Sequence, residues 1–125
     1  MSKVYIASTW ENRKLLRPTA KHLTTWYNHE VTSTWIYRDN GESAEIEAHR
    51  DLVDIDRCDT FVLWPDEKRK HSTGKFFELG YAFAKGKRII VVDRSTTKCV
   101  FLSLYAPEQI QFVSTWQQLY DLLEN

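Results

Sequence analysis

Short apolar runs alternate with longer amphipathic stretches along the chain, and this alternation limits the possible folds more than any other feature. Strands are expected at KVYIAS (3–8), VTSTWIY (31–37), TFVLW (60–64), KRIIVVD (87–93) and QIQFV (109–113). Helices are expected at 11–28, 42–57, 75–85, 98–105 and 114–124. Pro18 interrupts the first of these helices, which is therefore expected either to begin near Pro18 or to be kinked there.

The resulting order is β-α repeated five times, and strands joined by helix-length connections must be mostly parallel. FVLW and IIVV are apolar without alternation, as expected of central strands covered on both faces. The predicted fold class is α/β, a flavodoxin-like or Rossmann-like three-layer sandwich with a mostly parallel five-stranded sheet. A length of 125 residues suits one domain, so residues 1–125 are expected to form a single domain.

The charge balance limits the kinds of partner. Lys plus Arg equals Asp plus Glu at 17 each, so no global field favours nucleic acid or a membrane, and a small-molecule partner is expected. Cys58 and Cys99 lie far apart and form no CxxC or Cys/His cluster, which fits reduced thiols in a cytosol. MSKVYIAS is too short for a signal-peptide core and no later run reaches membrane-spanning length, so a cytoplasmic protein is expected.

Several common cofactor and catalytic motifs are missing from the sequence. Neither the GxGxxG of dinucleotide binding nor the P-loop pattern is present, and there is no GxSxG elbow of a serine hydrolase. The four histidines are scattered without metal-ligating spacing. We therefore expect no metal and no organic cofactor.

The ligand site of an open parallel sheet lies at the carboxyl ends of its strands. Applied to the predicted strands, this rule points to Ser8–Arg13, Arg38–Gly41, Pro65–Gly74 and Asp93–Thr97. Basic residues gather in and after the third of these connections, near an expected helix start: Lys68, Arg69, Lys70, His71 and Lys75. Such a group would suit a phosphate or another anion, with an ordinary solvated loop as the alternative.

Asp51 falls on the expected buried face of the helix at 42–57. That apolar stripe, at 100° per residue, consists of Ala44, Ala48, Leu52, Ile55 and Cys58. A carboxylate within it is costly unless it is paired, hydrogen-bonded or used in a site. The alternative is that the helix is slightly rotated about its axis, so that Asp51 lies at the solvent-exposed edge of this face. Asp54 and Asp56 fall about a quarter turn to either side, and Asp59 has the character of a cap or loop acceptor.

Glu78 is expected in the first turn or so of the helix opened by Ser72-Thr73-Gly74. The positive end of the helix dipole would there favour an ionised carboxylate, competent as a nucleophile or base at neutral pH. A solvated first-turn glutamate is the simpler alternative. Its neighbours argue against that alternative, because they leave the helix little face for water: Phe76, Phe77, Leu79, Tyr81 and Phe83.

Three segments, in chain order, carry a resemblance to a known family. They are KVYIAS with Tyr5, RDLVDIDRCD with Asp51 and Asp59, and STGKFFELGYAFAKGKRI with Glu78. Together they resemble the nucleoside 2-deoxyribosyltransferase family, including its branch of deoxynucleoside 5′-monophosphate N-glycosidases. The most specific part of the match is the pattern GxxxELGYAxAxGK.

The resemblance implies cleavage of the N-glycosidic bond of a deoxynucleoside or its 5′-monophosphate, with transfer of the deoxyribosyl group to water or another base. By position it implies Glu78 as nucleophile, Tyr5 as the residue that orients it, and Asp51 as an aid to sugar positioning or proton transfer. The candidate substrate-binding positions are Ser8, Thr9, Trp10, Ser72, Gly74 and Asp59. Ser72 stands where the monophosphate hydrolases carry serine, which favours a phosphorylated substrate and hydrolysis.

The resemblance also implies that no cofactor is needed and that the protein is a homo-oligomer whose site is completed by a neighbouring subunit. Ser103 is one possible contribution of that kind. Two departures from the family pattern leave an alternative open. Phe76 stands where many members have glycine and could narrow the sugar pocket, and the first loop, STWENR, lacks a glycine-rich character. An inactive nucleotide-binding or sensor protein on the same fold is therefore the alternative, and a glycohydrolase of another nucleotide such as NAD is a third.

Overall fold

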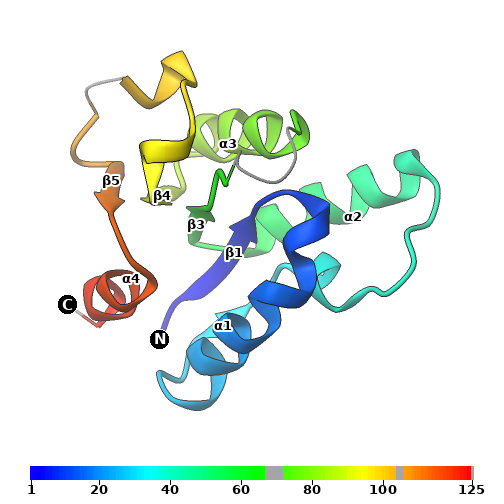
Figure 1. Cartoon of the computed structure of the whole chain (residues 1–125), viewed down its shortest axis with the longest axis horizontal. Coiled ribbons are helices and arrows are strands. Elements are labelled where there is room, and N and C mark those ends of the chain that lie inside the picture. Colours follow the sequence, from blue (N-terminus) through cyan, green and yellow to red (C-terminus); the bar gives the residue numbers. More distant parts are fainter. Residues whose placement is uncertain (67–71, 104–105, 125) are drawn as a thin grey trace.

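A computed structural model of the chain describes residues 1–66, 72–103 and 106–124. Five parallel strands form one sheet with helices on both faces (Figure 1). The strands are β1 (Lys3–Ala7), β2 (Glu30–Val31), β3 (Thr60–Leu63), β4 (Arg88–Val92) and β5 (Ile110–Val113). The helices are α1 (Arg13–Thr25), α2 (Ala44–Arg57), α3 (Gly74–Ala84) and α4 (Trp116–Leu123). The predicted α/β class is confirmed, and the sheet is parallel throughout.

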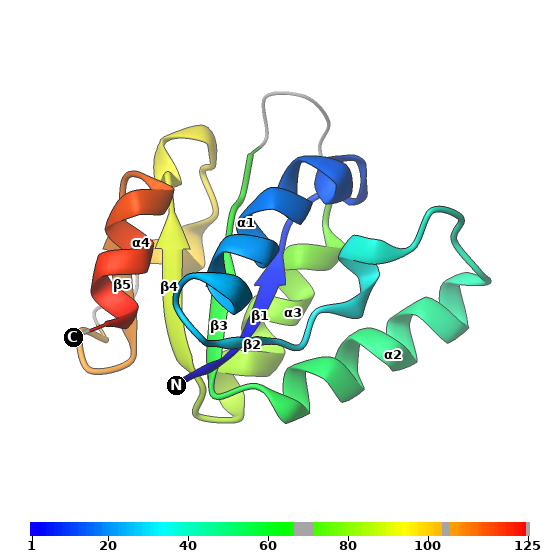
Figure 2. The ribbon, with the colours of Figure 1, turned by 90° about the horizontal axis from the view of Figure 1, so that it is seen from below.

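The strand order is β2-β1-β3-β4-β5, so the direction in which the sheet is built reverses between β1 and β3. Such a reversal leaves a crevice beyond the carboxyl ends of the two strands. Val4 to Ala7 of β1 pair in register with Thr60 to Leu63 of β3. Helices α1 and α4 cover one face of the sheet, and α2 and α3 cover the other (Figure 2).

The core lies between the sheet and these helices. β1 and β3 are fully buried from Val4 to Ala7 and from Phe61 to Leu63. The rings of Tyr5 and Phe61, which are partners in the β1–β3 register, stack with their centroids 5.6 Å apart. This continuous burial is what the unbroken apolar runs predicted. Within the described ranges, no helix combines the length and the apolar composition that a membrane crossing requires.

The strand predicted at 31–37 is wrong over most of its length. β2 stops at its second residue, and Thr34–Tyr37 form a short 3-10 helix. Side chains from this region bond to β1 instead of a longer strand. The Ile6 amide donates to Ser33 Oγ at 3.1 Å, and the Trp35 indole N–H donates to the Ile6 carbonyl at 2.8 Å. These side chains satisfy backbone groups that a strand would otherwise have paired.

Two predicted helices differ from the structure. The helix predicted at 98–105 is a short 3-10 helix, Val100–Ser103, and residues 104–105 lie outside the described ranges. The helix interrupted by Pro18 begins at Arg13, so the expectation of a start near Pro18 is wrong. Pro18 is exposed, and water can therefore reach the carbonyl that lacks a hydrogen bond one turn earlier.

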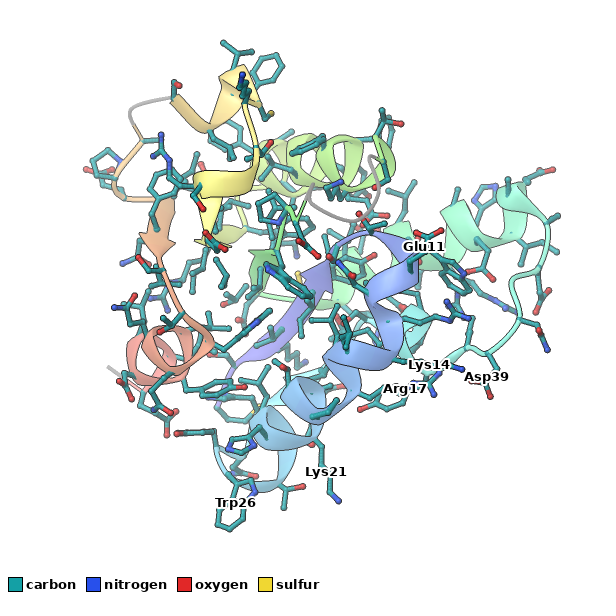
Figure 3. The ribbon with its side chains drawn as sticks, in the orientation of Figure 1. Glu11, Lys14, Arg17, Lys21, Trp26 and Asp39 are labelled. Atoms are coloured by element: carbon teal, nitrogen blue, oxygen red, sulfur yellow. The ribbon has the colours of Figure 1, made fainter. Side chains whose placement is uncertain are left out.

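Two arginines of α1 hold the segment that leads into α2. Arg13 donates to the carbonyl oxygens of Arg38 and Asp39, at 2.9 and 3.0 Å. Arg17 donates to the Ile36 carbonyl at 2.9 Å and forms an ion pair with the Asp39 carboxylate at 2.9 Å. Figure 3 shows Arg17 and Asp39 side by side at the edge of α1. The loop that follows is thereby fixed, and it forms part of the pocket described below.

Asp54 joins α2 to the same region from inside the fold. Its side chain is buried, with 5% of the residue exposed. The carboxylate accepts hydrogen bonds from the Thr34 amide at 3.0 Å and from the Thr34 hydroxyl at 2.7 Å. Arg57 approaches it to 3.7 Å. Asp54 therefore holds the first residue of the 3-10 helix against α2.

We expect Asp54→Ala to lower the free energy of unfolding by about 2 kcal/mol, because it leaves both Thr34 donors without their acceptor. Urea denaturation measures this change. The control is Glu45→Ala, an exposed position on the same helix, which should change stability by about 0.5 kcal/mol or less. Equal effects of the two substitutions would contradict the role given to Asp54.

Candidate active site

A pocket of about 240 Å³ opens beside the point where the strand order reverses. Its walls come from β1, α2, the start of α3 and the loops between them. The lining residues are Tyr5, Ser8, Trp10, Trp35, Gly41, Glu47, Asp51, Ser72, Gly74, Lys75 and Glu78. The structure thus brings together seven of the nine site residues that the sequence suggested.

Three groups meet at the floor of the pocket. The Tyr5 hydroxyl, carried by the buried strand β1, donates to Glu78 Oε1 at 2.9 Å. Glu78 of α3 and Asp51 of α2 lie close enough that each carboxyl affects the pKa of the other. Asp51 Oδ1 is buried and has no hydrogen-bond partner in the described part of the chain. The two carboxyls therefore form a pair, with a phenol bonded to one of them.

Burial shifts the protonation of this pair. Desolvation, followed by the negative charge of Asp51, raises the pKa of Glu78 to about 8, although the hydrogen bond from Tyr5 acts in the opposite direction. Desolvation also raises the pKa of Asp51 to about 6, with the hydrogen bond to Glu78 opposing it. Desolvation and the two carboxylates raise the pKa of Tyr5 well above its ordinary value, so Tyr5 remains a donor. At neutral pH the two carboxyls hold about one proton between them.

The expectation that the helix dipole keeps Glu78 ionised is wrong. Glu78 is the fifth residue of α3, and the first turn of that helix holds no acidic residue. The dipole effect falls off within the first turn, whereas desolvation acts on the whole charge of the carboxylate. Burial beside Asp51 therefore outweighs the helix start, and the free site keeps a proton on the pair.

The inward face of α2 is more acidic than the sequence suggested. Ala44 and Ala48, expected on the buried stripe, are exposed. The face turned to the protein carries Glu47, Asp51 and Asp54 at spacings of four and three residues. Asp51 is half-buried on it, whereas Asp54, expected a quarter turn away, is more deeply buried. Sequence reasoning did not identify Glu47, and the signal that could have found it is its four-residue spacing from Asp51.

Lys75 is a buried cation in the wall of the pocket, with 2% of the residue exposed. Its ammonium group donates to the Ser72 carbonyl at 2.9 Å and to Ser72 Oγ at 3.0 Å. It also donates to Thr9 Oγ1 at 3.4 Å, and the Thr9 and Ser72 hydroxyl oxygens lie 3.3 Å apart. A cation, two hydroxyls and the start of α3 thus converge, which suits an anion. The other members of the predicted basic loop, at 68–71, lie outside the described residues.

Two indole rings form the apolar part of the pocket wall. The rings of Trp10 and Trp35 lie 6.2 Å apart between centroids. The Arg13 guanidinium packs over Trp10, 4.3 Å from its centroid. Gly41 lies opposite, where a Cβ would come within 3.9 Å of the Trp10 ring. Trp35 was missed as a site residue because the sequence suggested a longer strand there. Flat ring faces of this kind suit a base or a sugar.

Two of the predicted binding residues do not line the pocket. Thr9 is buried just behind its wall and reaches the site through Ser72 and Lys75. Asp59 lies at the opposite, amino end of β3, where it accepts from the Lys3 amide at 3.0 Å and from the neighbouring Thr60 hydroxyl at 2.8 Å. These bonds are those of a loop acceptor, so the structure does not support Asp59 as a substrate-binding residue.

Phe76 does not line the pocket, although its ring centroid lies 4.8 Å from Lys75 Nζ. Its ring lines a separate apolar groove together with Leu79 and Phe83, and it is not among the residues that line the pocket. The expected narrowing of the sugar pocket by Phe76 is therefore not observed. Ser103 is exposed at the end of its 3-10 helix and lines neither cavity. In the described part of the chain, no three His, Cys, Asp or Glu side chains are grouped as metal ligands would be.

Comparison with known proteins agrees with this geometry. The model of the family described as nucleoside 2-deoxyribosyltransferase matches residues 4–112. The structure of the CMP N-glycosidase BcmB from Clostridium botulinum is similar, with a TM-score of 0.71 and 21% sequence identity over 98% of each chain. No curated protein sequence matches the chain at a significant level. At this identity the structural likeness establishes the fold, and the family match covers most of the chain.

The raised pKa of Glu78 predicts how stability depends on pH. The ordinary value is 4.5 and the folded value is about 8. The folded state therefore keeps a proton that the unfolded state has lost, and stability falls as pH rises through this window. Glu78→Gln carries no such proton, so its stability relative to the wild type is expected to increase by about 1 kcal/mol or more across the window.

Thermal or urea unfolding at several pH values between 4.5 and about 8 measures this difference. Glu45→Gln, at an exposed position on α2, is the control and should stay parallel to the wild type throughout. A constant difference between Glu78→Gln and the wild type over the window would show that burial does not perturb Glu78.

Proposed function

The chain belongs to the nucleoside 2-deoxyribosyltransferase family, and from this premise we propose that it cleaves the N-glycosidic bond of a deoxynucleoside or, preferably, a nucleoside 5′-monophosphate. Glu78 is the nucleophile and water the preferred acceptor. The observation that carries the proposal is the pair of carboxyls, Glu78 and Asp51, which line one open pocket while the Tyr5 hydroxyl is bonded to Glu78. Cleavage of a glycosidic bond needs a nucleophile and a general acid, and a carboxylate beside a second, protonated carboxyl can supply both.

In the first step the shared proton resides on Asp51, and the Glu78 carboxylate attacks the anomeric carbon of the sugar. The bond from that carbon to the base nitrogen breaks, its electron pair stays with the base, and Asp51 gives its proton to the base. The product is an ester between the sugar and Glu78. The Tyr5 hydroxyl stabilises the free carboxylate before attack, because it is already bonded to Oε1.

In the second step Asp51 accepts a proton from water, and the resulting hydroxide attacks the anomeric carbon. Glu78 leaves as a carboxylate, and the pair again holds one proton. Two displacements at the same carbon retain its configuration. Attack by another base in place of water would give transfer, so the same residues serve both outcomes.

The anion-binding end of the pocket favours a 5′-monophosphate. Lys75 and the hydroxyls of Ser72 and Thr9 already bond to one another, so a phosphate would join an arranged set of donors. The similar Clostridium botulinum protein is named as a CMP N-glycosidase, and CMP is a 5′-monophosphate of a ribonucleoside. Tests must therefore include both sugars. The inactive sensor alternative loses one of its two grounds, since Phe76 does not line the pocket.

We expect the protein to release free base from at least one member of a panel of nucleosides, their 5′-monophosphates and NAD. Chromatography of the products, with and without an added acceptor base, measures release and transfer. Glu78→Gln should lower the rate by about 10³-fold or more, because it removes the nucleophile. Glu45→Gln is the matched control and should retain the wild-type rate. Tight binding with no release from any compound would favour the sensor alternative.

We also propose that the chain forms a homo-oligomer through the surface around α3. Large apolar side chains are exposed there: Phe77 at 68%, Val100 at 71% and Phe101 at 65%. Phe77 is next to Glu78 and lines a shallow hollow beside it, and Phe101 lines the groove that holds Phe76. Exposed apolar groups of this kind mark interaction surfaces. A second copy seated on Phe77 would lie next to Glu78, because both residues line the same hollow.

Phe101→Ser is expected to shift the protein towards the monomer, because it replaces apolar contact area with a polar group. Sedimentation velocity over a range of protein concentrations measures the shift. Trp26→Ser, at a residue that directly follows α1 and is 74% exposed, is the control and should keep the wild-type oligomeric state. A wild-type protein that remains monomeric at all concentrations would refute the oligomer.

A further inference from the structure

We propose that Glu47 determines which base is accepted, favouring bases with an amino group on the edge opposite the sugar over bases with an oxo group there. The favoured bases are cytosine and adenine, and the disfavoured ones are uracil, thymine and hypoxanthine. This inference rests on the proposed function, because it assigns the base-binding end of the same pocket.

The position of Glu47 follows from the geometry of α2. Glu47 and Asp51 both line the pocket and are four residues apart on one helix face. Four residues advance by about 6 Å along a helix. Asp51 bonds to Glu78 where the glycosidic bond must lie, so Glu47 faces a point one turn further on. In a pyrimidine nucleotide, the group at the 4-position lies in line with the glycosidic bond at a similar distance.

The chemistry of Glu47 favours a donor at that point. Its carboxylate forms an ion pair with Arg38, and Oε1 accepts from the Glu42 amide at 3.1 Å. These bonds leave part of the acceptor capacity of the carboxylate unused, out of about four lone-pair sites. A carboxylate has no hydrogen to donate. An amino group can therefore bond to it, whereas an oxo group would place two acceptors against each other.

Arg38, the cation that is bonded to Glu47, is not one of the residues that line the pocket. The rings of Trp10 and Trp35 line the same pocket as Glu47. The Trp35 indole N–H already donates to the Ile6 carbonyl at 2.8 Å. The side chain of Glu47 is itself 18% exposed, so it is neither sealed off from a ligand nor fully solvated. The far edge of a bound base thus meets an acceptor.

A purely structural role for Glu47 is the rival explanation, since the Arg38 pair and the Glu42 bond also hold the loop onto α2. The two explanations differ in one measurable respect. A structural role affects all bases alike, whereas an acceptor facing the base discriminates between amino and oxo partners of the same shape. Matched substrate pairs separate them.

The experiment compares base release from CMP with UMP and from AMP with IMP, in the ribo and deoxy series. The amino member of each pair should have a kcat/KM higher by about 100-fold or more, as in sites built to hydrogen-bond a substrate group. Glu47→Gln offers a side-chain amide that can donate to an oxo group, and should reduce the preference to within about tenfold. Arg38→Met keeps the carboxylate while removing its ion-pair partner, and should keep the wild-type preference.

Equal rates within the wild-type pairs would overturn the inference, and this comparison needs no variant to fold. An unchanged preference in Glu47→Gln, or its loss in both variants, would also overturn it. If the wild type releases no base from any nucleotide, the proposed function fails separately. Quenching of tryptophan fluorescence then decides, since tighter binding of AMP than IMP would support the role of Glu47 and equal binding would refute it.

Discussion

The site depends on the parallel pairing of β1 with β3, at the place where the strand order reverses. This pairing brings the carboxyl ends of two strands together, so the segments that follow them must meet. The consequence is visible in the 3.3 Å between the hydroxyl oxygens of Thr9 and Ser72, which are 63 residues apart in sequence. The same pairing stacks Tyr5 on Phe61 and directs the Tyr5 hydroxyl towards α3. A pocket at any other strand end would lack this buried phenol.

A phenol beside Glu78 has a different effect from a cation in the same place. A lysine or arginine would lower the pKa of the carboxyl and fix its charge, whereas a neutral hydroxyl can bond to the charged or the protonated form. The cation closest in sequence to Glu78 among the pocket residues, Lys75, is bonded instead to Ser72 and Thr9. The carboxyl pair is thus left to share one proton. The first proposed step needs that state, since it requires one charged and one protonated carboxyl, and the second step restores it.

Much of the fold could be predicted because it is encoded locally. Unbroken apolar runs identify buried parallel strands, and the helices between them follow from length and periodicity. The short length of β2 could not be predicted. Beyond Val31, the side chains of Ser33 and Trp35 bond to the distant strand β1 in place of a longer strand. The prediction that Glu78 is ionised failed for a similar reason. Position in a helix is a local property, but the burial and the Asp51 charge that decide its pKa come from elsewhere in the chain.

Two predictions were made for Asp59. Its residue type predicts a loop acceptor, whereas its position in the family pattern predicts a substrate-binding residue, and the observed bonds agree with the loop acceptor. An aspartate between a helix and a strand is a common loop acceptor, and this one accepts from the Lys3 amide and the Thr60 hydroxyl. At Asp51, in contrast, the sequence pattern gave only part of the result. Its place on the inward face was visible from periodicity, but its pairing with Glu78 is seen only in the structure.

Helix α2 shows why this site is hard to recognise from hydrophobicity alone. Three of its inward-facing residues are carboxylates, and each is compensated differently. Glu47 is paired with Arg38, Asp51 shares a proton with Glu78, and Asp54 accepts from Thr34. A helix held in this way buries less apolar area. Its polar contacts are directional, however, and they fix the rotation of the helix about its axis more strictly than apolar contacts would. That fixed rotation allows one helix to present the proposed acid, Asp51, and the proposed base-selecting group, Glu47, one turn apart. A pattern of acidic residues at i, i+4 and i+7 can therefore indicate a site and not a solvated face.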